Sequence, residues 1–513
     1  MKTDQTTQAW RLYEAGKDYK RRIGLYETVR RNERFYRGEQ WTTSGDGLPR
    51  PVFNVIRRVV DHLIGTVAPG EISIHYTDDR LPFLDVAATR ERVSDGLSLL
   101  NKHAAYRWAQ SRMDELSGRA LLDAAVTGDG IFLCRWDNSC DCGQPFCGDI
   151  RTELIPSTSY FPADPESADV QSQDHIILSG RSTVASLRAE AIEAGMTPEE
   201  ASAITADEAD PSVLPASEVG CAEKATYLIR FYRENGEVML EKSTRTHLIR
   251  CVPTGLKYYP IAAFNWTPTK NSCHGTSPVS EMIPNQQYVN SAYAMAMKHM
   301  SDTAFSKVVY DKSRIPEWSN GVGEAIAALG GGNVSDAVSV VGVGQMQEGY
   351  LDLIEGVIEN TKELMGATDS SLGTENANNT SAILALQAAS RVALRQVEAR
   401  FARCIGELAT VWADMICAYS PPERLLPVPE SGSVRARRID YKLLQNELLH
   451  ATAKMSNTDR FTPAATVAVL DRLLANGHIT VAQYLEHLPE GCIGDKNALI
   501  QSIGEKGGMT ANV

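Results

Sequence analysis

A stretch of about 40 residues around position 400 carries no proline and a single glycine, and it constrains the fold of this chain more than any other feature. Residues recur there every three or four positions along one face, which predicts one long α-helix over residues 380–420. At ~1.5 Å per residue it would be about 60 Å long. One stripe of that length needs a long partner, and Gly406 is the expected position of a kink. The stripe consists of Ile383, Leu386, Ser390, Leu394, Val397, Phe401, Ile405, Leu408, Trp412, Met415 and Tyr419.

Two further helices are predicted before the long one. Thr276-Ser277-Pro278 favours a helix start, because proline is preferred at the first helical position, and no glycine follows before Tyr310. This predicts a helix over residues 277–310. The second helix, over residues 347–365, ends at Gly366, since glycine is favoured just after a helix end. Its apolar face consists of Tyr350, Ile354, Val357, Thr361 and Leu364.

The segments that separate these helices differ in character. Residues 311–346 contain Pro316, Trp318 and many glycines, which predicts a compact excursion without a helix. Residues 366–379 are small and polar and carry no Lys or Arg, which predicts a loop.

The rest of the chain predicts an α+β body. Short β-branched and aromatic runs separated by Gly, Pro and Asp extend from Gly130 to Trp266 and indicate strands. Residues 186–223 interrupt them with nine acidic residues and one basic residue, which predicts a helical surface insertion. Residues 421–450 return to strand-like sequence, and small helices follow up to the C-terminus. A chain of 513 residues is long enough for several domains.

Charge limits the kinds of partner. A net charge of -13 makes a general DNA-gripping surface unfavourable, since such surfaces neutralise phosphates with Lys and Arg. A conduit through which DNA slides should not bind DNA tightly. The acidic composition therefore does not exclude a DNA conduit. The first 37 residues are basic, with ten Lys or Arg against five Asp or Glu, which is typical of a solvated helical face. No signal peptide or membrane span is expected.

The sequence contains none of the common catalytic motifs. The phosphate-cradling pattern fails, because Asp18 follows Gly16-Lys17, and the patterns HExxH, GxSxG and GxGxxG are missing. We therefore predict neither enzymatic activity nor a cofactor.

Four cysteines lie within fourteen residues: Cys134, Cys140, Cys142 and Cys147. Four thiolates could close a tetrahedral zinc site, although the paired C-x2-C spacing typical of such sites is missing and free cysteines are common in cores. We predict no metal and leave structural zinc as the alternative. A nucleic-acid enzyme with a metal at these thiols is a further alternative, which lacks additional His or Asp ligands.

Several segments resemble the tailed-bacteriophage portal protein family. They are RFYRGEQW at Arg34 to Trp41, PVFNVIRRVV from Pro51, DKSRIPEWSNG from Asp311, ENTKELMGATDSSLG from Glu359 and NNTSAILALQAAS from Asn378. The order of the predicted elements is also similar to that of the family, so the resemblance covers nearly the whole chain.

The resemblance implies an α+β, helix-rich portal fold. Residues 1–276 would form the wing, 277–310 and 347–365 the stem helices, 311–346 the clip and 366–379 the tunnel loop. Residues 380–420 would be the long kinked helix, 421–450 a return to the wing and 451–513 the crown. The cysteine hairpin and the acidic insertion at 186–223 look like departures from the family's core pattern.

The resemblance also implies a function. Twelve subunits would form a ring at the unique capsid vertex, the head-tail connector through which double-stranded DNA passes non-specifically. The implied partners are the terminase large subunit during packaging, a head-tail adaptor afterwards, and the major capsid and scaffold proteins, with no membrane. The protein would be made in the host cytoplasm and reside in the virion.

Three groups of site residues follow from the resemblance. Lumen cations are expected at Lys298, Lys307, Lys312 and Arg314, with outward-facing solubility residues as the alternative. Clip contacts with terminase or adaptor are expected at Arg314, Pro316 and Trp318. The tunnel loop would present Thr368, Asp369, Ser370, Ser371, Thr374, Glu375, Asn376, Asn378 and Asn379 to DNA.

A different class of function remains possible for the long helix. It could form a coiled-coil dimer in a non-portal scaffold or interaction protein of the virion. Particle images discriminate between the two, because dimers or rods favour the scaffold and rings with a central hole favour the portal.

Overall fold

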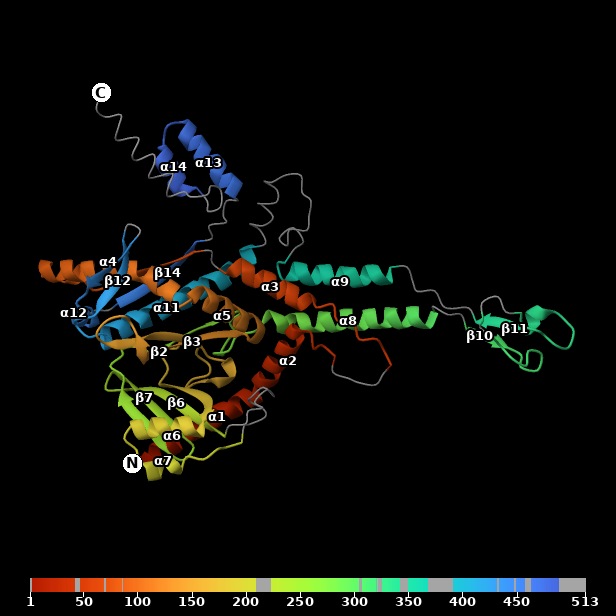
Figure 1. Cartoon of the computed structure of the whole chain (residues 1–513), viewed down its shortest axis with the longest axis horizontal. Coiled ribbons are helices and arrows are strands. Elements are labelled where there is room, and N and C mark those ends of the chain that lie inside the picture. The colour runs from red at the N-terminus through yellow and green to blue at the C-terminus, as the bar shows by residue number, and fades with distance from the viewer. Residues whose placement is uncertain are drawn as a thin grey trace.

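A computed structural model shows a broad body from which two helices project side by side, α8 (Pro278–Thr303) and α9 (Tyr350–Leu364) (Figure 1). The expected α+β class is confirmed. The structure describes residues 2–41, 47–68, 71–84, 86–208, 223–303, 307–319, 321, 325–341, 349–367, 391–430, 433–446, 449–456 and 463–488.

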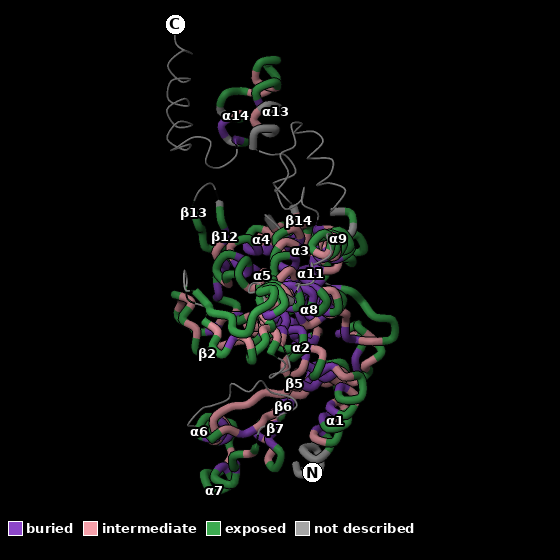
Figure 2. The backbone as a smooth tube through the Cα atoms, turned by 90° about the vertical axis from the view of Figure 1, so that its right-hand side faces the viewer, coloured by how far each residue is buried: buried purple, intermediate pink, exposed green. Residues whose placement is uncertain are grey.

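Helix α11 (Arg395–Tyr419) occupies the centre of the body (Figure 2). Every residue from Leu408 to Cys417 is buried, so the helix is covered on all sides and not along one stripe alone. The prediction of a single stripe packed on one long partner is therefore wrong for this part, because several sheets and helices of the chain surround it. The described part of the helix offers no seam to a coiled-coil partner. A short 3-10 turn, Arg391–Leu394, precedes α11, and residues 380–390 lie outside the described residues.

Helix α11 continues without a break through Gly406. A Cβ atom built on Gly406 would lie 2.7 Å from the carbonyl oxygen of Ala451. Ala451 belongs to β14 (Leu449–Ser456), and its backbone N–H donates to Oγ1 of Thr410 at 3.0 Å. The glycine therefore lets the strand cross the helix at close range.

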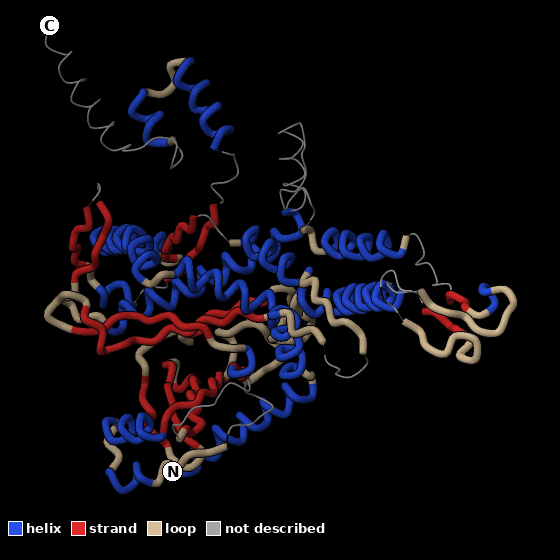
Figure 3. Tube along the Cα trace, turned by 45° about the vertical axis from the view of Figure 1, so that its right-hand side comes forward, coloured by secondary structure: helices blue, strands red, loops and turns tan. Residues whose placement is uncertain are grey.

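A three-stranded antiparallel sheet lies against the central helices. Its order is β3 (Cys147–Leu154), β2 (Asp129–Asp141) and β9 (Ile261–Asn265). The first six residues of β2 are buried on both sides, as in a sheet covered on both faces. Helices α11 and α5 (Met113–Thr127) pack on this sheet, and Figure 3 shows its long strands running beneath the helical layer.

A five-stranded antiparallel sheet forms the outer part of the body, in chain order. Its strands are β4 (Tyr160–Pro162), β5 (His175–Thr183), β6 (Lys224–Glu234), β7 (Glu237–Thr244) and β8 (Leu248–Pro253). Helix α1 (Lys2–Arg22) covers one face, where Tyr13 packs with Phe161 and Leu228. Helices α6 (Val184–Glu193) and α7 (Pro198–Ser202) pack against Ala225 and Ile249. Ala225 and Leu228 face opposite sides of β6, since side chains alternate along a strand.

The predicted acidic insertion contains α6 and α7, and it is joined closely to this sheet. Lys242 of β7 lies 2.6 Å from Glu190 of α6, and Arg181 of β5 lies 3.2 Å from Asp207. Residues 209–222 lie outside the described residues.

The remaining elements link distant parts of the chain. Helices α2 (Leu25–Arg37), α3 (Val55–Val67), α4 (Ala87–Gln110) and α12 (Tyr441–Gln445) complete the body. Strand β1 (Glu71–Asp78) pairs with β14, and β12 (Leu425–Glu430) pairs with β13 (Ser433–Arg438). The predicted wing boundary at residue 450 therefore falls inside β14, a strand of the body. Helices α13 (Pro463–Ala475) and α14 (Val481–His487) follow.

The predicted stem helix over residues 277–310 is too long at its end. Helix α8 ends at Thr303, and residues 307–310 form strand β10 (Lys307–Tyr310), which pairs with β11 (Val338–Val341). Val308, Val309 and Tyr310 favour a strand because β-branched and aromatic residues suit a paired, pleated backbone. Figure 1 shows this hairpin beyond the far ends of α8 and α9.

We predict that Gly406→Ala destabilises the body by about 1–3 kcal/mol, because the new methyl group overlaps the backbone of β14. The measurement is the urea or thermal unfolding midpoint. Gly118→Ala, in α5, is the matched control, since a Cβ there meets nothing within 4 Å and alanine favours the helix by about 1 kcal/mol. Equal stability of the two variants would contradict the close approach.

Candidate functional site: the helical arm

Helices α8 and α9 form an antiparallel arm with its own small apolar core. Val289 and Ala292 of α8 pack with Ile354 of α9, flanked by aromatic and aliphatic side chains. The hydroxyl of Tyr350 donates to the carbonyl of Ala292 at 3.3 Å. Nearer the body, the amide of Asn285 donates to Oγ1 of Thr361 at 3.0 Å. These contacts fix the two helices as one unit.

The arm also exposes large apolar side chains along both helices. They are Tyr288, Met295, Met297 and Met300 on α8 and Leu351, Leu353 and Leu364 on α9. Exposed large apolar side chains in this number on two adjacent helices are typical of surfaces that contact other proteins.

The lumen cations expected from the sequence have different surroundings. Nζ of Lys298 lies 2.9 Å from Asp302 one turn along α8, so a carboxylate of its own helix compensates its charge. Lys312 is exposed. Arg314 donates to the carbonyls of Gly331 and Asn333 at 3.4 and 3.3 Å and so supports the loop between β10 and β11. Lys307 begins β10.

The three clip residues expected to contact partners lie close to the β10–β11 hairpin. The ring of Trp318 stacks on Tyr310, with centroids 5.3 Å apart and an interplanar angle of 22°. This stacking and the contacts of Arg314 support the β10–β11 hairpin and its loop, whereas Pro316 is exposed. Contact of all three with terminase or adaptor stays a prediction.

Sequence reasoning missed a line of carboxylates on α9. Asp352, Glu355, Glu359 and Glu363 are all exposed and follow one another at intervals of three, four and four residues. This spacing places them along one side of the helix. The three- and four-residue spacing of these carboxylates is the sequence signal that marks them.

The predicted tunnel loop, residues 366–379, falls largely outside the described part of the chain. Its expected DNA-facing residues, Thr368, Asp369, Ser370, Ser371, Thr374, Glu375, Asn376, Asn378 and Asn379, lie outside the described residues.

A family model described as "Phage P22-like portal protein" matches residues 176–434, half of the 513-residue chain. The match includes the arm, the hairpin beyond it and α11. The chain belongs to the P22-like phage portal protein family. The resemblance inferred from the sequence is thereby confirmed. A comparison with curated proteins finds no match.

Membership of the portal family places the chain in the virion as part of a capsid-associated oligomer. Within the described part of the chain, no helix combines the length and the apolar character that a membrane crossing requires.

The base of the portal arm is fastened to the body by neutral side-chain amides. Oε1 of Gln286 accepts from the backbone N–H groups of Val55 and Ile56 at 2.9 and 3.4 Å, at the start of α3. Its Nε2 donates to the carbonyl of Phe53 at 2.8 Å and to Oδ1 of Asn290 at 2.9 Å.

The amide network continues into the segment between α2 and α3. Nδ2 of Asn290 donates to Gln40 at 2.7 Å, and Nε2 of Gln40 donates to Asn54 at 3.1 Å. Oδ1 of Asn54 also accepts from the N–H of Arg57 at 3.1 Å and so caps α3. Gln286, Asn290 and Gln40 are buried, so the network fixes the arm without burying a charge.

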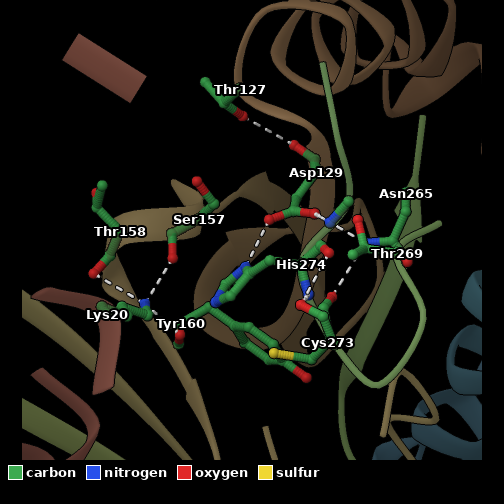
Figure 4. Close-up of polar contacts among 12 residues, drawn as sticks. Lys20, Thr127, Asp129, Ser157, Thr158, Tyr160, Asn265, Thr269, Cys273 and His274 are labelled. Atoms are coloured by element: carbon green, nitrogen blue, oxygen red, sulfur yellow. Dashed lines mark hydrogen bonds and ion pairs between the residues drawn. The ribbon is translucent and has the colours of Figure 1, made fainter. Parts of the chain in front are cut away.

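A second joint, drawn in Figure 4, connects the three-stranded sheet with the segment just before α8. Oδ2 of Asp129 lies 2.7 Å from Nδ1 of His274, and Oδ1 accepts from Asn265 and from the N–H of Gly275, both at 2.7 Å. Gly275 also lies so close to Gly128 that a Cβ on Gly128 would come within 2.3 Å of its carbonyl oxygen. Both positions therefore require glycine.

Lys20 anchors α1 to the same region. Its buried ammonium donates to the carbonyls of Ser157, Thr158 and Tyr160 at 2.6, 3.1 and 2.5 Å. Burial lowers the pKa of Lys20 from 10.5 to about 7, while Asp129 acts in the opposite direction.

The four clustered cysteines do not come together at one point. Cys134 is buried beside Thr152, and burial raises its pKa to about 12. Cys147 pairs with Asp141 at the far end of the β2–β3 hairpin, seven residues away along β2 or roughly 20 Å. Across the described residues, no three His, Cys, Asp or Glu side chains gather as metal ligands. The geometry therefore disfavours the four-thiol zinc alternative.

We predict that Gln286→Leu destabilises the protein by about 2–4 kcal/mol, because it leaves the donors at the start of α3 and the Phe53 carbonyl without partners. Unfolding in urea, followed by circular dichroism, measures the change. Gln287→Leu is the matched control, since the neighbouring side chain is exposed. Similar losses in both variants would rule out the network as the anchor.

The buried Lys20 predicts a pH-dependent stability. The pKa of Lys20 is about 7 in the folded protein and 10.5 when unfolded, so the unfolded chain binds more protons between these values. Stability should rise with pH over this range, by at most about 4 kcal/mol from pH 7 to 10. Lys20→Met should lack this rise. A constant difference in unfolding free energy between the two proteins from pH 7 to 10 would refute the prediction.

Proposed function

We propose that twelve copies of this chain form a ring around a channel at the unique capsid vertex, through which the phage genome enters and leaves. The observation that carries the proposal is the apolar surface of the arm, which α8 and α9 expose to solvent in the single chain. A ring of head-to-tail contacts covers such surfaces when neighbouring arms lie side by side.

The negative charge of the arm supports the passage of DNA without tight binding. The carboxylates at Asp352, Glu355, Glu359 and Glu363 repel phosphates, and Lys298 is compensated by Asp302. A surface of this kind releases few counterions from DNA and so binds it weakly. The protein would act as a conduit and not as an enzyme, and the energy for packaging would come from a separate motor.

The partners follow from this role. The clip, with Pro316 exposed beside the β10–β11 hairpin, would dock the terminase large subunit during packaging and a head-tail adaptor afterwards. The body would meet the major capsid protein and the scaffold protein. Assembly would take place in the host cytoplasm.

The arm surface gives a direct test of ring formation. Negative-stain images and mass photometry of the wild-type protein should show rings of twelve with a central hole. Leu351→Asp combined with Leu353→Asp should yield monomers with unchanged helix content, because charges replace apolar groups in the contact.

Ile192→Asp on α6 is the matched control, because Ile192 and Leu351 are both 46% exposed. This variant should still form rings. Full ring assembly by the double arm variant would show that the arms do not hold the ring together.

A further inference from the structure

A cavity of about 50 Å³ lies where α4, the end of the β2–β3 hairpin, the last turns of α11 and β12 meet. Polar side chains dominate its wall, and two of them are arginines, Arg107 of α4 and Arg424 just before β12. The cavity belongs neither to the arm nor to the joints that anchor it.

Two buried guanidinium groups share one carboxylate in this wall. Nη1 of Arg107 lies 2.5 Å from Oδ1 of Asp149, and Nη2 of Arg424 lies 3.4 Å from the same oxygen. The side chains of Arg107 and Arg424 are only 4% and 9% exposed. Among the described residues, Asp149 is the only carboxylate paired with either arginine, so one positive charge remains uncompensated.

The other contacts of the two arginines are to neutral groups. Arg107 donates to the carbonyl of Ile150, and Arg424 donates to the carbonyl of Gly148 at 2.7 Å. Nε of Arg107 is buried and has no hydrogen-bond partner within the described part of the chain. Burying a charge that lacks a counter-charge is expensive, commonly several kcal/mol.

His103, which also lines the cavity, does not change this charge balance. Its Nδ1 lies 2.8 Å from the carbonyl of Pro427. Burial lowers the pKa of His103 to about 4, and both arginines act in the same direction, so the ring is neutral near pH 7. The cavity wall therefore keeps an excess charge of one at neutral pH.

We propose that this cavity binds a small oxyanion of the phosphate class. Guanidinium groups offer several N–H donors in a plane, which matches the oxygens of phosphate. Bound there, the anion would compensate the second arginine and tie β12 to α4 and to the β2–β3 hairpin. The site does not depend on ring formation, so it can be tested apart from the proposed conduit.

Isothermal titration calorimetry with inorganic phosphate, at pH 7.5 and constant ionic strength, tests the proposal on the full chain. The wild-type protein should bind phosphate saturably. Arg424→Gln should weaken the affinity about tenfold or more, because it removes one charged partner. Asp149→Asn should strengthen it severalfold, because it removes the carboxylate that competes for both arginines.

The opposite signs of these two effects separate binding from general destabilisation, which would weaken the affinity in both variants. Arg230→Gln is the control, since Arg230 is also largely buried but pairs one-to-one with Glu241 at 3.3 Å. It should keep the wild-type affinity. Absence of saturable binding in the wild-type protein, or weaker binding in Asp149→Asn, would overturn the proposal. If Arg424→Gln does not fold, the sign of the Asp149→Asn effect decides alone.

Discussion

The amide of Gln286 is the contact on which the rest of the portal architecture depends. Its oxygen accepts hydrogen bonds from the N–H groups of Val55 and Ile56 at the start of α3, and its nitrogen donates to the carbonyl of Phe53. These bonds hold α8 at the point where the arm leaves the body. A long arm magnifies any change of angle at its base. A network of buried amides is well suited to this place, because neutral groups with every hydrogen bond made have few alternative arrangements and no charge to desolvate.

Apolar side chains are buried in the body, whereas several large ones are exposed on the arm. In the body, every residue of α11 from Leu408 to Cys417 is buried, and Gly406 lets β14 approach the helix backbone. In the arm, the core is limited to a few residues around Val289 and Ile354, while large side chains remain exposed. The body therefore buries its apolar side chains within one chain, whereas the arm leaves several of them exposed.

The sequence predicted the existence of the helices better than their surroundings. The periodicity around Tyr350 and Ile354 located α9 correctly, and Pro278 marked the first residue of α8. The end of α8 was wrong, because the pairing of residues 307–310 with β11 depends on residues about thirty positions away. The setting of α11 was also wrong, since periodicity reveals the most apolar face of a helix but not how many neighbours surround it.

The joints of the portal could not be predicted, because each brings together residues distant in the chain. Asp129 and His274 are 145 residues apart, and neither carries a local signal of its partner. Cations were equally hard to assign, since Lys298 turned out to be compensated on its own helix while Arg314 supports a loop. Sequence gives the number of charges, but their function depends on which of them the fold pairs.

The charged side chains of the five-stranded sheet and those of α9 have different surroundings. Buried cations of the five-stranded sheet have single carboxylate partners, as in Arg230 with Glu241 and Lys242 with Glu190. The carboxylates along α9 are instead exposed, where water solvates them and where they repel other anions. The exposed carboxylates along α9 would therefore repel a polyanion brought close to this helix.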